Sequence, residues 1–215
     1  MDAETKTLAV ETPAKLTLHF QLGDKLIDSA TINPMTFQAY STYVAEAFSM
    51  TEPDDVDTRL RRIRMARQVS YHAGGVTVPV TLLDVLELPI ADARKIIAAL
   101  NMSFLVGSPP GKIIRDGDGI DKAITFELGT PLQLGLGKEP IQELEFYVRK
   151  YGDVEDVMAE FVPAIQTMRL IKAVAKPMPG SLQRLSDGML SQITLADGLT
   201  IMREILPSFL GSPAE

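Results

Sequence analysis

The sequence contains no cysteine and no tryptophan, and only two histidines, His19 and His72. Without cysteine the chain has no disulfide, no thiolate metal site and no catalytic thiol, and a reducing compartment is its simplest setting. Two histidines leave little for a zinc site, and no nucleophile motif stands near either of them. We therefore expect no catalytic residues, no metal ligands and no cofactor.

Long hydrophobic runs are also missing. A helix that crosses a bilayer needs about 20 mostly apolar residues. The most apolar stretches, residues 82–90 and 97–106, are interrupted by charged or polar side chains. Residues 1–5 are acidic and polar, whereas a secretory signal would begin with positive charge and continue with an apolar run. The sequence therefore predicts no membrane association, and a location in the cytoplasm where the protein is made.

Positive charge is scarce, since the formal net charge is −7. Nucleic-acid binding needs clustered Lys and Arg, so we expect no nucleic-acid partner. One basic run is the exception: Arg59, Arg61, Arg62, Arg64 and Arg67. Four acidic residues precede it: Glu52, Asp54, Asp55 and Asp57. These acidic side chains can balance the run and favour the N-terminus of a helix, so local charge balance is the better interpretation.

With 215 residues, of which 46% are hydrophobic, the chain can bury a substantial core. Residues 1–14 are polar and aperiodic, and we expect a flexible arm. Alternation over residues 16–20 and 27–32, with Gly23-Asp24 between them, is typical of a hairpin. Thr36 can cap a helix, and further helices are predicted over residues 58–69, 82–86 and 91–100. Gly74-Gly75 is expected to end the ordered segment after the second of these helices, with His72 in the loop beside it.

Residues 106–122 are rich in Gly, Pro and Asp and predict a linker. After it, Ile124, Phe126 and Leu128 alternate as a strand, residues 141–148 can pair with them, and a helix follows Gly152-Asp153. The prediction is an α+β chain of two modules, residues 15–105 and 123–215. Each module is a β-hairpin or small antiparallel sheet followed by three to four helices.

The modules predict an internal duplication. Ile90-Ala91-Asp92-Ala93 matches Leu195-Ala196-Asp197-Gly198 at an offset of 105 positions. The same offset places Ile63, Met65 and Val69 on Met168, Leu170 and Val174, and Arg64 and Arg67 on Arg169 and Lys172. Fixed-offset similarity together with a shared order of elements is the signature of a repeat. The recurring basic positions indicate a shared edge that faces solvent or a partner.

Several motifs resemble ligand sites but fit a structural role better. Gly107–Lys112 lacks the spacing and the Ser or Thr of a phosphate loop. Asp116, Asp118 and Asp121 form an imperfect calcium loop, because the turn glycine is misplaced. The acidic pairs Asp54-Asp55 and Glu143 with Glu145 are expected on solvated faces. Methionines Met158, Met168, Met189 and Met202 fit a core, or alternatively an adaptable surface that binds an apolar helix.

Several segments of the second half together form a recognisable pattern: Ile124-Thr125-Phe126-Glu127-Leu128, Ile141–Phe146 with Arg149, Tyr151-Gly152-Asp153-Val154, Leu182-Gln183-Arg184-Leu185, Leu195-Ala196-Asp197-Gly198 and Phe209-Leu210-Gly211. The resemblance is to the tail assembly chaperone family of long-tailed bacteriophages. It covers residues 121–211, and reaches residues 15–102 only through the repeat. The first half departs from the pattern, since Asn33-Pro34-Met35-Thr36 stands where an Arg and a Gly-Asp pair would be expected.

The resemblance implies a non-enzymatic protein of the host cytoplasm that binds the tape-measure protein during tail assembly. The doubled length leaves an alternative, a permanent structural component of the virion tail or baseplate with other baseplate subunits as partners. Which residues bind the partner is not predicted from the sequence.

Overall fold

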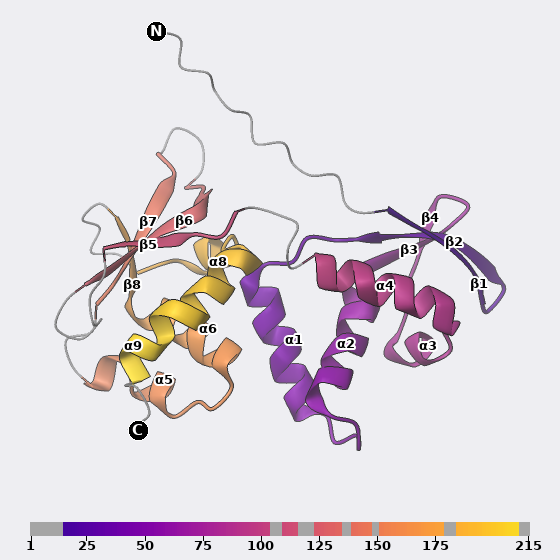
Figure 1. Ribbon diagram of the computed structural model, residues 1–215, viewed down its shortest axis with the longest axis horizontal. Coiled ribbons are helices and arrows are strands. Elements are labelled where there is room, and N and C mark those ends of the chain that lie inside the picture. Colours follow the sequence, from indigo (N-terminus) through magenta and orange to yellow (C-terminus); the bar gives the residue numbers. More distant parts are fainter. Residues whose placement is uncertain are drawn as a thin grey trace, which may run out of the picture. The chain divides into compact units, whose positions relative to one another are not determined.

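The computed structural model describes residues 15–103, 109–115, 123–134, 139–147, 151–178 and 184–210. Over these ranges the chain is an α+β protein with two antiparallel four-stranded sheets, so the predicted α+β class is confirmed (Figure 1). The described residues form two compact units. Unit 1 contains those up to Pro34 together with Met65–Ser103, and unit 2 contains Met35–Arg64 together with those after residue 108. The expected arm, residues 1–14, lies outside the described residues.

The sheet of unit 1 has the order β1-β2-β3-β4. Its strands are β1 (Lys15–Leu22), β2 (Lys25–Ile32), β3 (Val69–Ala73) and β4 (Val76–Val78). The predicted hairpin is β1–β2, which turns at Gly23 with a positive φ of 61°. The prediction around residues 69–75 was wrong, because Val69 and His72 lie in β3. Gly74 and Gly75 both adopt positive φ, as the tightest hairpin turns require. They form the turn between β3 and β4 and do not end a helix.

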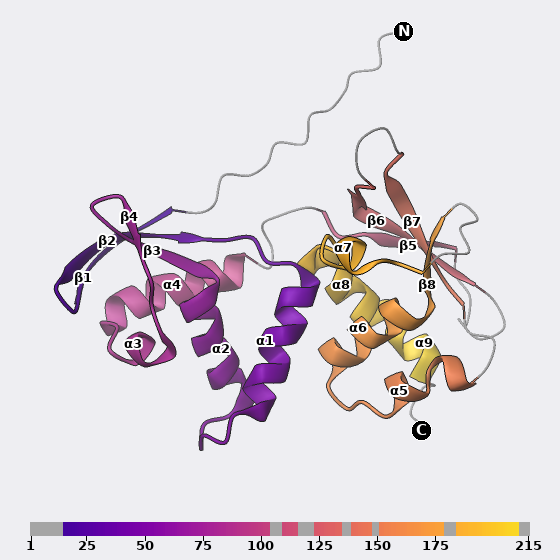
Figure 2. The same cartoon turned by 180° about the vertical axis from the view of Figure 1, so that it is seen from behind.

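Two helices of unit 1, α3 (Leu82–Leu86) and α4 (Ile90–Met102), lie over one face of this sheet (Figures 1 and 2). Thr81 and Asp84 form a reciprocal capping box that begins α3. Ile96 and Leu100 of α4 are buried in one cluster with Phe20 and Tyr71 of the sheet. The rings of Phe20 and Tyr71 meet edge to face at 6.3 Å, so the core of unit 1 lies between its sheet and these helices.

The sheet of unit 2 has the order β5-β6-β7-β8. Its strands are β5 (Lys112–Arg115), β6 (Ile124–Leu132), β7 (Ile141–Phe146) and β8 (Ala175–Met178). Strands β6 and β7 confirm the predicted pair. The predicted linker, residues 106–122, is wrong in part, because Lys112–Arg115 pairs with β6 as an edge strand. Ile113 packs partly buried against the core of unit 2, whereas Ile114 is exposed. The Gly and Pro content around these residues concealed the strand.

The helices of unit 2 come from two parts of the chain. The first part supplies α1 (Phe37–Ser49) and most of α2 (Val56–Arg67), whose last turn belongs to unit 1. The second supplies the remaining elements: η1 (Tyr151–Asp153), α5 (Glu155–Met158), α6 (Pro163–Val174), α7 (Asp187–Leu190), α8 (Leu195–Thr200), the π-helical turn η2 (Ile201–Ile205) and α9 (Leu206–Leu210). Helix α1 packs against α6 and α8 (Figures 1 and 2).

The predicted first module, residues 15–105, is therefore not one compact unit. Thr36 caps α1 as predicted, with its hydroxyl accepting from the Ala39 amide at 3.3 Å. However, Phe37 is fully buried in the core cluster of unit 2, with strand and helix residues such as Phe126 and Ile201. Burying a Phe side chain stabilises by about 1.5–3 kcal/mol, and apolar burial does not depend on sequence distance. Residues Met35–Arg64 accordingly fold with the second half of the chain.

Candidate functional site

The groups that resembled a phosphate loop are engaged in the fold of unit 2. The Gly111 amide donates to Asp197 Oδ1 at 2.7 Å, and Lys112 Nζ lies 3.1 Å from Glu127 Oε2. A phosphate would need that amide and that ammonium free to donate. Gly107 and the calcium-loop residues Asp116, Asp118 and Asp121 lie outside the described residues.

Both histidines lie in strands of unit 1. The His19 backbone amide donates to Asp92 Oδ2 at 3.4 Å. The His72 ring lies between two hydroxyls, with Nε2 3.2 Å from Thr31 Oγ1 and Nδ1 3.4 Å from Thr77 Oγ1. These contacts join β3 to its neighbouring strands β2 and β4.

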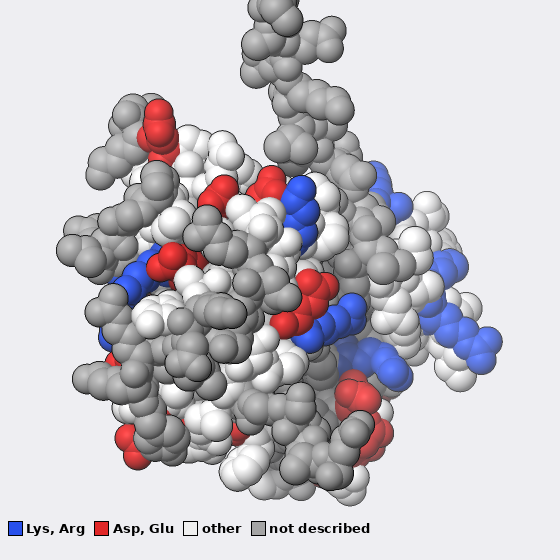
Figure 3. Space-filling view, turned by 60° about the vertical axis from the view of Figure 1, so that its left-hand side comes forward, with Lys and Arg blue, Asp and Glu red and all other residues white. Residues whose placement is uncertain are grey.

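The acidic pair Glu143 and Glu145 lies on β7, where both side chains are partly exposed. Glu143 stands opposite Glu127 of β6, and Glu145 stands opposite Lys176 of β8. On the face of the molecule shown in Figure 3, Lys and Arg side chains lie among Asp and Glu. The register of β6, β7 and β8 itself places both signs of charge around the acidic pair, as expected for a solvated face.

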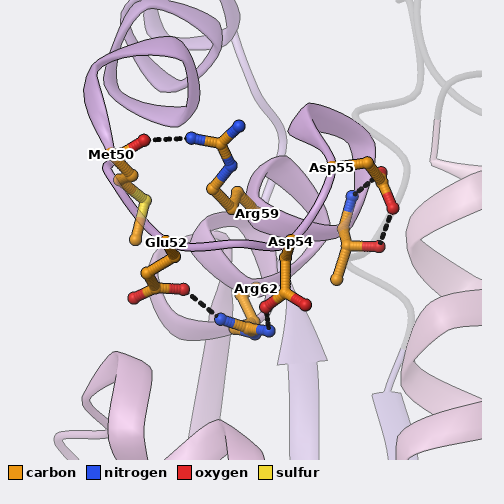
Figure 4. A network of polar contacts seen from close by, with 7 residues as sticks. Met50, Glu52, Asp54, Asp55, Arg59 and Arg62 are labelled. Atoms are coloured by element: carbon orange, nitrogen blue, oxygen red, sulfur yellow. Dashed lines mark hydrogen bonds and ion pairs between the residues drawn. The ribbon is translucent and has the colours of Figure 1, made fainter.

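The basic run of α2 balances the acidic loop before it, as predicted. Arg62 pairs with both Glu52 and Asp54, and Arg59 donates to the Met50 carbonyl (Figure 4). Asp55 accepts from the Thr58 amide at 2.8 Å and from its hydroxyl at 2.9 Å, which caps the first turn of α2. The hydrogen bonds from Thr58 lower the pKa of the Asp55 carboxyl. These bonds hold the α1–α2 loop in one conformation.

The prediction that Arg64 faces solvent or a partner was wrong. Arg64 is buried, and burial lowers its pKa to about 10, while the nearby Tyr40 partly opposes that shift. Its counterpart Arg169 does lie at the surface, where Nη2 is 3.1 Å from Glu160 Oε2. The two positions differ in environment, since Arg64 is buried beside Tyr40 of α1 whereas Arg169 pairs with Glu160 at the surface.

The methionines split between two roles. Met168, Met189 and Met202 are partly buried against the core cluster of unit 2, as the core interpretation predicted. Met158 at the end of α5 is instead exposed.

Two buried carboxylates, Asp92 in α4 and Asp197 in α8, lie 105 positions apart and make similar contacts within their own units. Each sits in the first turn of its helix and accepts a backbone amide from a strand beside it. Asp92 accepts from His19 of β1, and Asp197 Oδ1 accepts from Gly129 of β6 at 2.9 Å. Both strands have an irregular register in this region. The carboxylates thus attach each helix to its sheet.

Among the described residues of unit 1, three exposed aliphatic side chains fall within eight residues of sequence, and we define them as the α3–α4 patch: Leu83, Leu86 and Ile90. Leu83 is 75% exposed, Leu86 is 55% exposed and Ile90 is 73% exposed. Leu83 and Leu86 are three positions apart on α3, so they share a face of that helix. Clustered exposed aliphatic side chains, in contrast to single ones, mark interaction surfaces. The patch is therefore the candidate functional site of unit 1.

A second apolar exposure lies in the α5–α6 loop of unit 2, where Phe161 is 91% exposed. The loop is well anchored. Glu160 Oε1 accepts from the Phe161 and Val162 amides at 3.0 and 3.1 Å, and buried Gln166 donates to the carbonyls of Val157 and Glu160. An aromatic side chain held out on an anchored loop loses little entropy on binding, which is typical of an interface anchor.

Within the described residues, no group of His, Asp and Glu side chains is arranged to hold a metal ion. No described helix combines the length and the apolar character needed to cross a bilayer. A scan against protein-family models found no match, and the searches of curated proteins and of solved structures found none either. Of the residues that carried the family resemblance, Arg149, Leu182, Gln183 and Gly211 lie outside the described part of the chain.

Proposed function

We propose that this protein acts in the assembly of a bacteriophage tail, where apolar helical surfaces bind a partner such as the tape-measure protein, without enzymatic activity. The observation that carries the proposal is the α3–α4 patch, three aliphatic side chains each more than half exposed within eight residues of sequence. Exposing such a patch is unfavourable unless a partner covers it. The family resemblance of the second half supports the tail-assembly context.

The finer architecture, two diverged copies of one module, is part of the proposal. Both halves order their elements as a hairpin, two helices, a third strand antiparallel to the second, and then capped helices. Thr81 and Ser186, 105 positions apart, both cap a short helix. The buried pairs Ile96 with Ile201 and Asp92 with Asp197 keep the same offset. The fourth strand differs, since β4 pairs with β3 whereas β5 pairs with β6.

The test is co-expression of the full chain with the tape-measure protein of the same phage. We expect a stable complex that co-purifies, because the partner's long amphipathic helices would cover the exposed apolar side chains. Replacing Leu83 and Leu86 by Ser should weaken co-purification, while Leu26→Ser, which alters an exposed aliphatic side chain in β2, should not. If the full chain stayed monomeric and formed no complex with the tape-measure protein, the chaperone function would be contradicted.

The second candidate is a permanent component of the tail or baseplate. The doubled length favours it, because two modules offer two binding surfaces on one chain, the α3–α4 patch and the α5–α6 loop. Mass spectrometry of purified virions separates the two candidates. A structural component is present in a fixed ratio to the tube protein, whereas a chaperone is absent from mature particles.

A further inference from the structure

Helix α1 shows how a helix is bound by the module of unit 2. At its start, Thr36 forms an isolated antiparallel bridge with Thr194, and the Phe37 amide donates to the Ile193 carbonyl at 3.0 Å. The Phe37 side chain then enters the core beside α8, and Gly198 leaves room for it. A Cβ built on Gly198 would lie 1.9 Å from Phe37 Cγ. An extended residue, a capped first turn and an apolar side chain over α8 therefore define this binding mode.

Unit 1 has the corresponding surface. At the offset of 105, Ile193, Leu195 and Gly198 correspond to Leu88, Ile90 and Ala93 at the start of α4. Leu195 is 7% exposed and lies in one buried cluster with Phe37, whereas Ile90 is 73% exposed. Leu86 and Leu83 of α3 extend this exposed surface. A side chain that is buried in the same cluster as Phe37 in unit 2 thus has an exposed equivalent in unit 1.

We infer that the face of Ile90 and Ala93, together with Leu86, binds an amphipathic helix of a partner protein in the way that unit 2 binds α1. Ile90 is exposed at the position of Leu195, which is buried in one cluster with Phe37 of helix α1, and this contrast points to a helix as the occupant. The inference rests on the proposed partner-binding function and assigns its surface in unit 1.

One difference between the units sets the specificity of this surface. Ala93 carries a Cβ where Gly198 has none, and a Cβ at that place in unit 2 would overlap the Phe37 ring. An aromatic side chain therefore does not fit at the first apolar position of the bound helix. The expected partner helix begins with a Ser or Thr cap followed by a smaller aliphatic residue, with further apolar residues at spacings of three and four.

The inference can be tested with two labelled peptides and the full chain. One peptide has the natural α1 sequence, residues 33–50, and the other carries Phe37→Leu. Fluorescence anisotropy should show saturable binding of the Phe37→Leu peptide and weaker binding of the natural peptide. In the full chain, Leu86→Ser with Ile90→Ser should weaken binding by about tenfold or more, as expected when two apolar contacts are lost. Ala93→Gly in the full chain should reduce the difference in affinity between the two peptides.

Leu26→Ser is the matched control, because it removes an exposed aliphatic side chain from the same unit outside α3 and α4. The affinity of the Leu26→Ser chain for the Phe37→Leu peptide should stay within about twofold of the affinity of the unaltered chain, a change below about 0.4 kcal/mol. Thermal melting monitors folding of every variant. Absence of saturable binding, or binding that survives the double substitution, would overturn the inference. If the tape-measure protein still co-purified with the full chain in either case, the proposed function would hold although the inference about this surface had failed. The two failures are therefore distinguishable.

Discussion

At the scale of single residues, the buried carboxylates Asp92 and Asp197 occupy corresponding places but have pKa shifts of opposite sign. Lys95 Nζ lies 2.8 Å from Asp92 and its hydrogen bond lowers the pKa of that carboxyl. Asp197 has no lysine at that place, since Thr200 corresponds to Lys95. Burial therefore raises the pKa of Asp197, although amides such as that of Gly129 and the Thr194 hydroxyl oppose the shift. The hydrogen bond from Lys95 is the largest influence on the pKa of Asp92, whereas burial is the largest influence on the pKa of Asp197.

Asp197→Ala should destabilise unit 2 by roughly 2–4 kcal/mol, because the amides of Gly111 and Gly129 would lose their buried acceptor. Asp197→Asn should cost less, since its amide oxygen can still accept from both. The measurement is the free energy of unfolding from urea titration. If Asp197→Ala were as stable as the unaltered chain, the two amides would have to be hydrogen-bonded elsewhere.

The pH dependence of the same variants follows from the signs of the shifts. The folded state binds the Asp197 proton more tightly than the unfolded state, so ionisation opposes folding as pH rises above about 3.8. The stability of the unaltered chain relative to Asp197→Asn should therefore fall with rising pH through the folded pKa. The stability of the unaltered chain relative to Asp92→Asn should change in the opposite direction. The stabilisation by the ionised Asp92 carboxylate should be lost as pH falls below about 3.8.

At the scale of elements, the position of α1 depends on close contact with α8. Phe37 is fully buried, and its ring and Cβ lie where a side chain on Gly198 would have to go. Glycine in a helix costs about 1 kcal/mol relative to alanine, so its presence in α8 has a packing cause. The contact makes α1 a part of the core of unit 2 instead of a connecting segment.

Gly198→Ala should lower the unfolding free energy by roughly 1–3 kcal/mol, because the Phe37 ring must move to admit the new methyl group. Phe37→Leu in the same chain should restore part of that loss, so a double-mutant cycle should give a favourable coupling. Gly188→Ala in α7 is the control. A Cβ there meets only Ser186 Oγ at 4.0 Å, so stability should be unchanged or slightly higher. Equal effects at both glycines would show that Phe37 does not pack on α8.

At the scale of the whole molecule, the chain forms two units that are not simple halves of the sequence. Unit 2 takes Met35–Arg64 from within the first half, and α2 continues from unit 2 into unit 1. Each unit has its own sheet and its own buried cluster. Separate cores generally open as separate cooperative units in native-state hydrogen exchange.

Leu144→Ala, in the buried face of β7, should destabilise unit 2 by roughly 2–5 kcal/mol. Amide protection should then fall together in β6, β7 and α1, while β1 and β2 keep theirs. Hydrogen exchange read by NMR or mass spectrometry measures this. The matched change in unit 1, Ile27→Ala, should do the reverse. If the amides of α1 followed Ile27→Ala, its assignment to unit 2 would be wrong.

The sequence by itself determined the local elements whose signals lie within a few neighbouring residues. Alternation predicted β1, β2, β6 and β7, and the Thr36 cap with helical spacing predicted α1. The charge balance around Arg62 was also predictable, because the acidic residues stand close by in the chain. Strands β3, β4, β5 and β8 were missed, because they are short and three of them, β3, β5 and β8, pair with strands predicted elsewhere in the chain.

Only the tertiary structure decided which apolar faces are covered. The segment from Leu82 to Leu88 is apolar on nearly all sides, so its sequence does not reveal that Leu83 and Leu86 stay exposed while Val85 and Leu88 are buried. In the same way, the apolar face of α1 fits a core without specifying which one. The physical reason is that the hydrophobic effect is non-directional. It requires burial, whereas the shape of the site, here the space above Gly198, selects the partner.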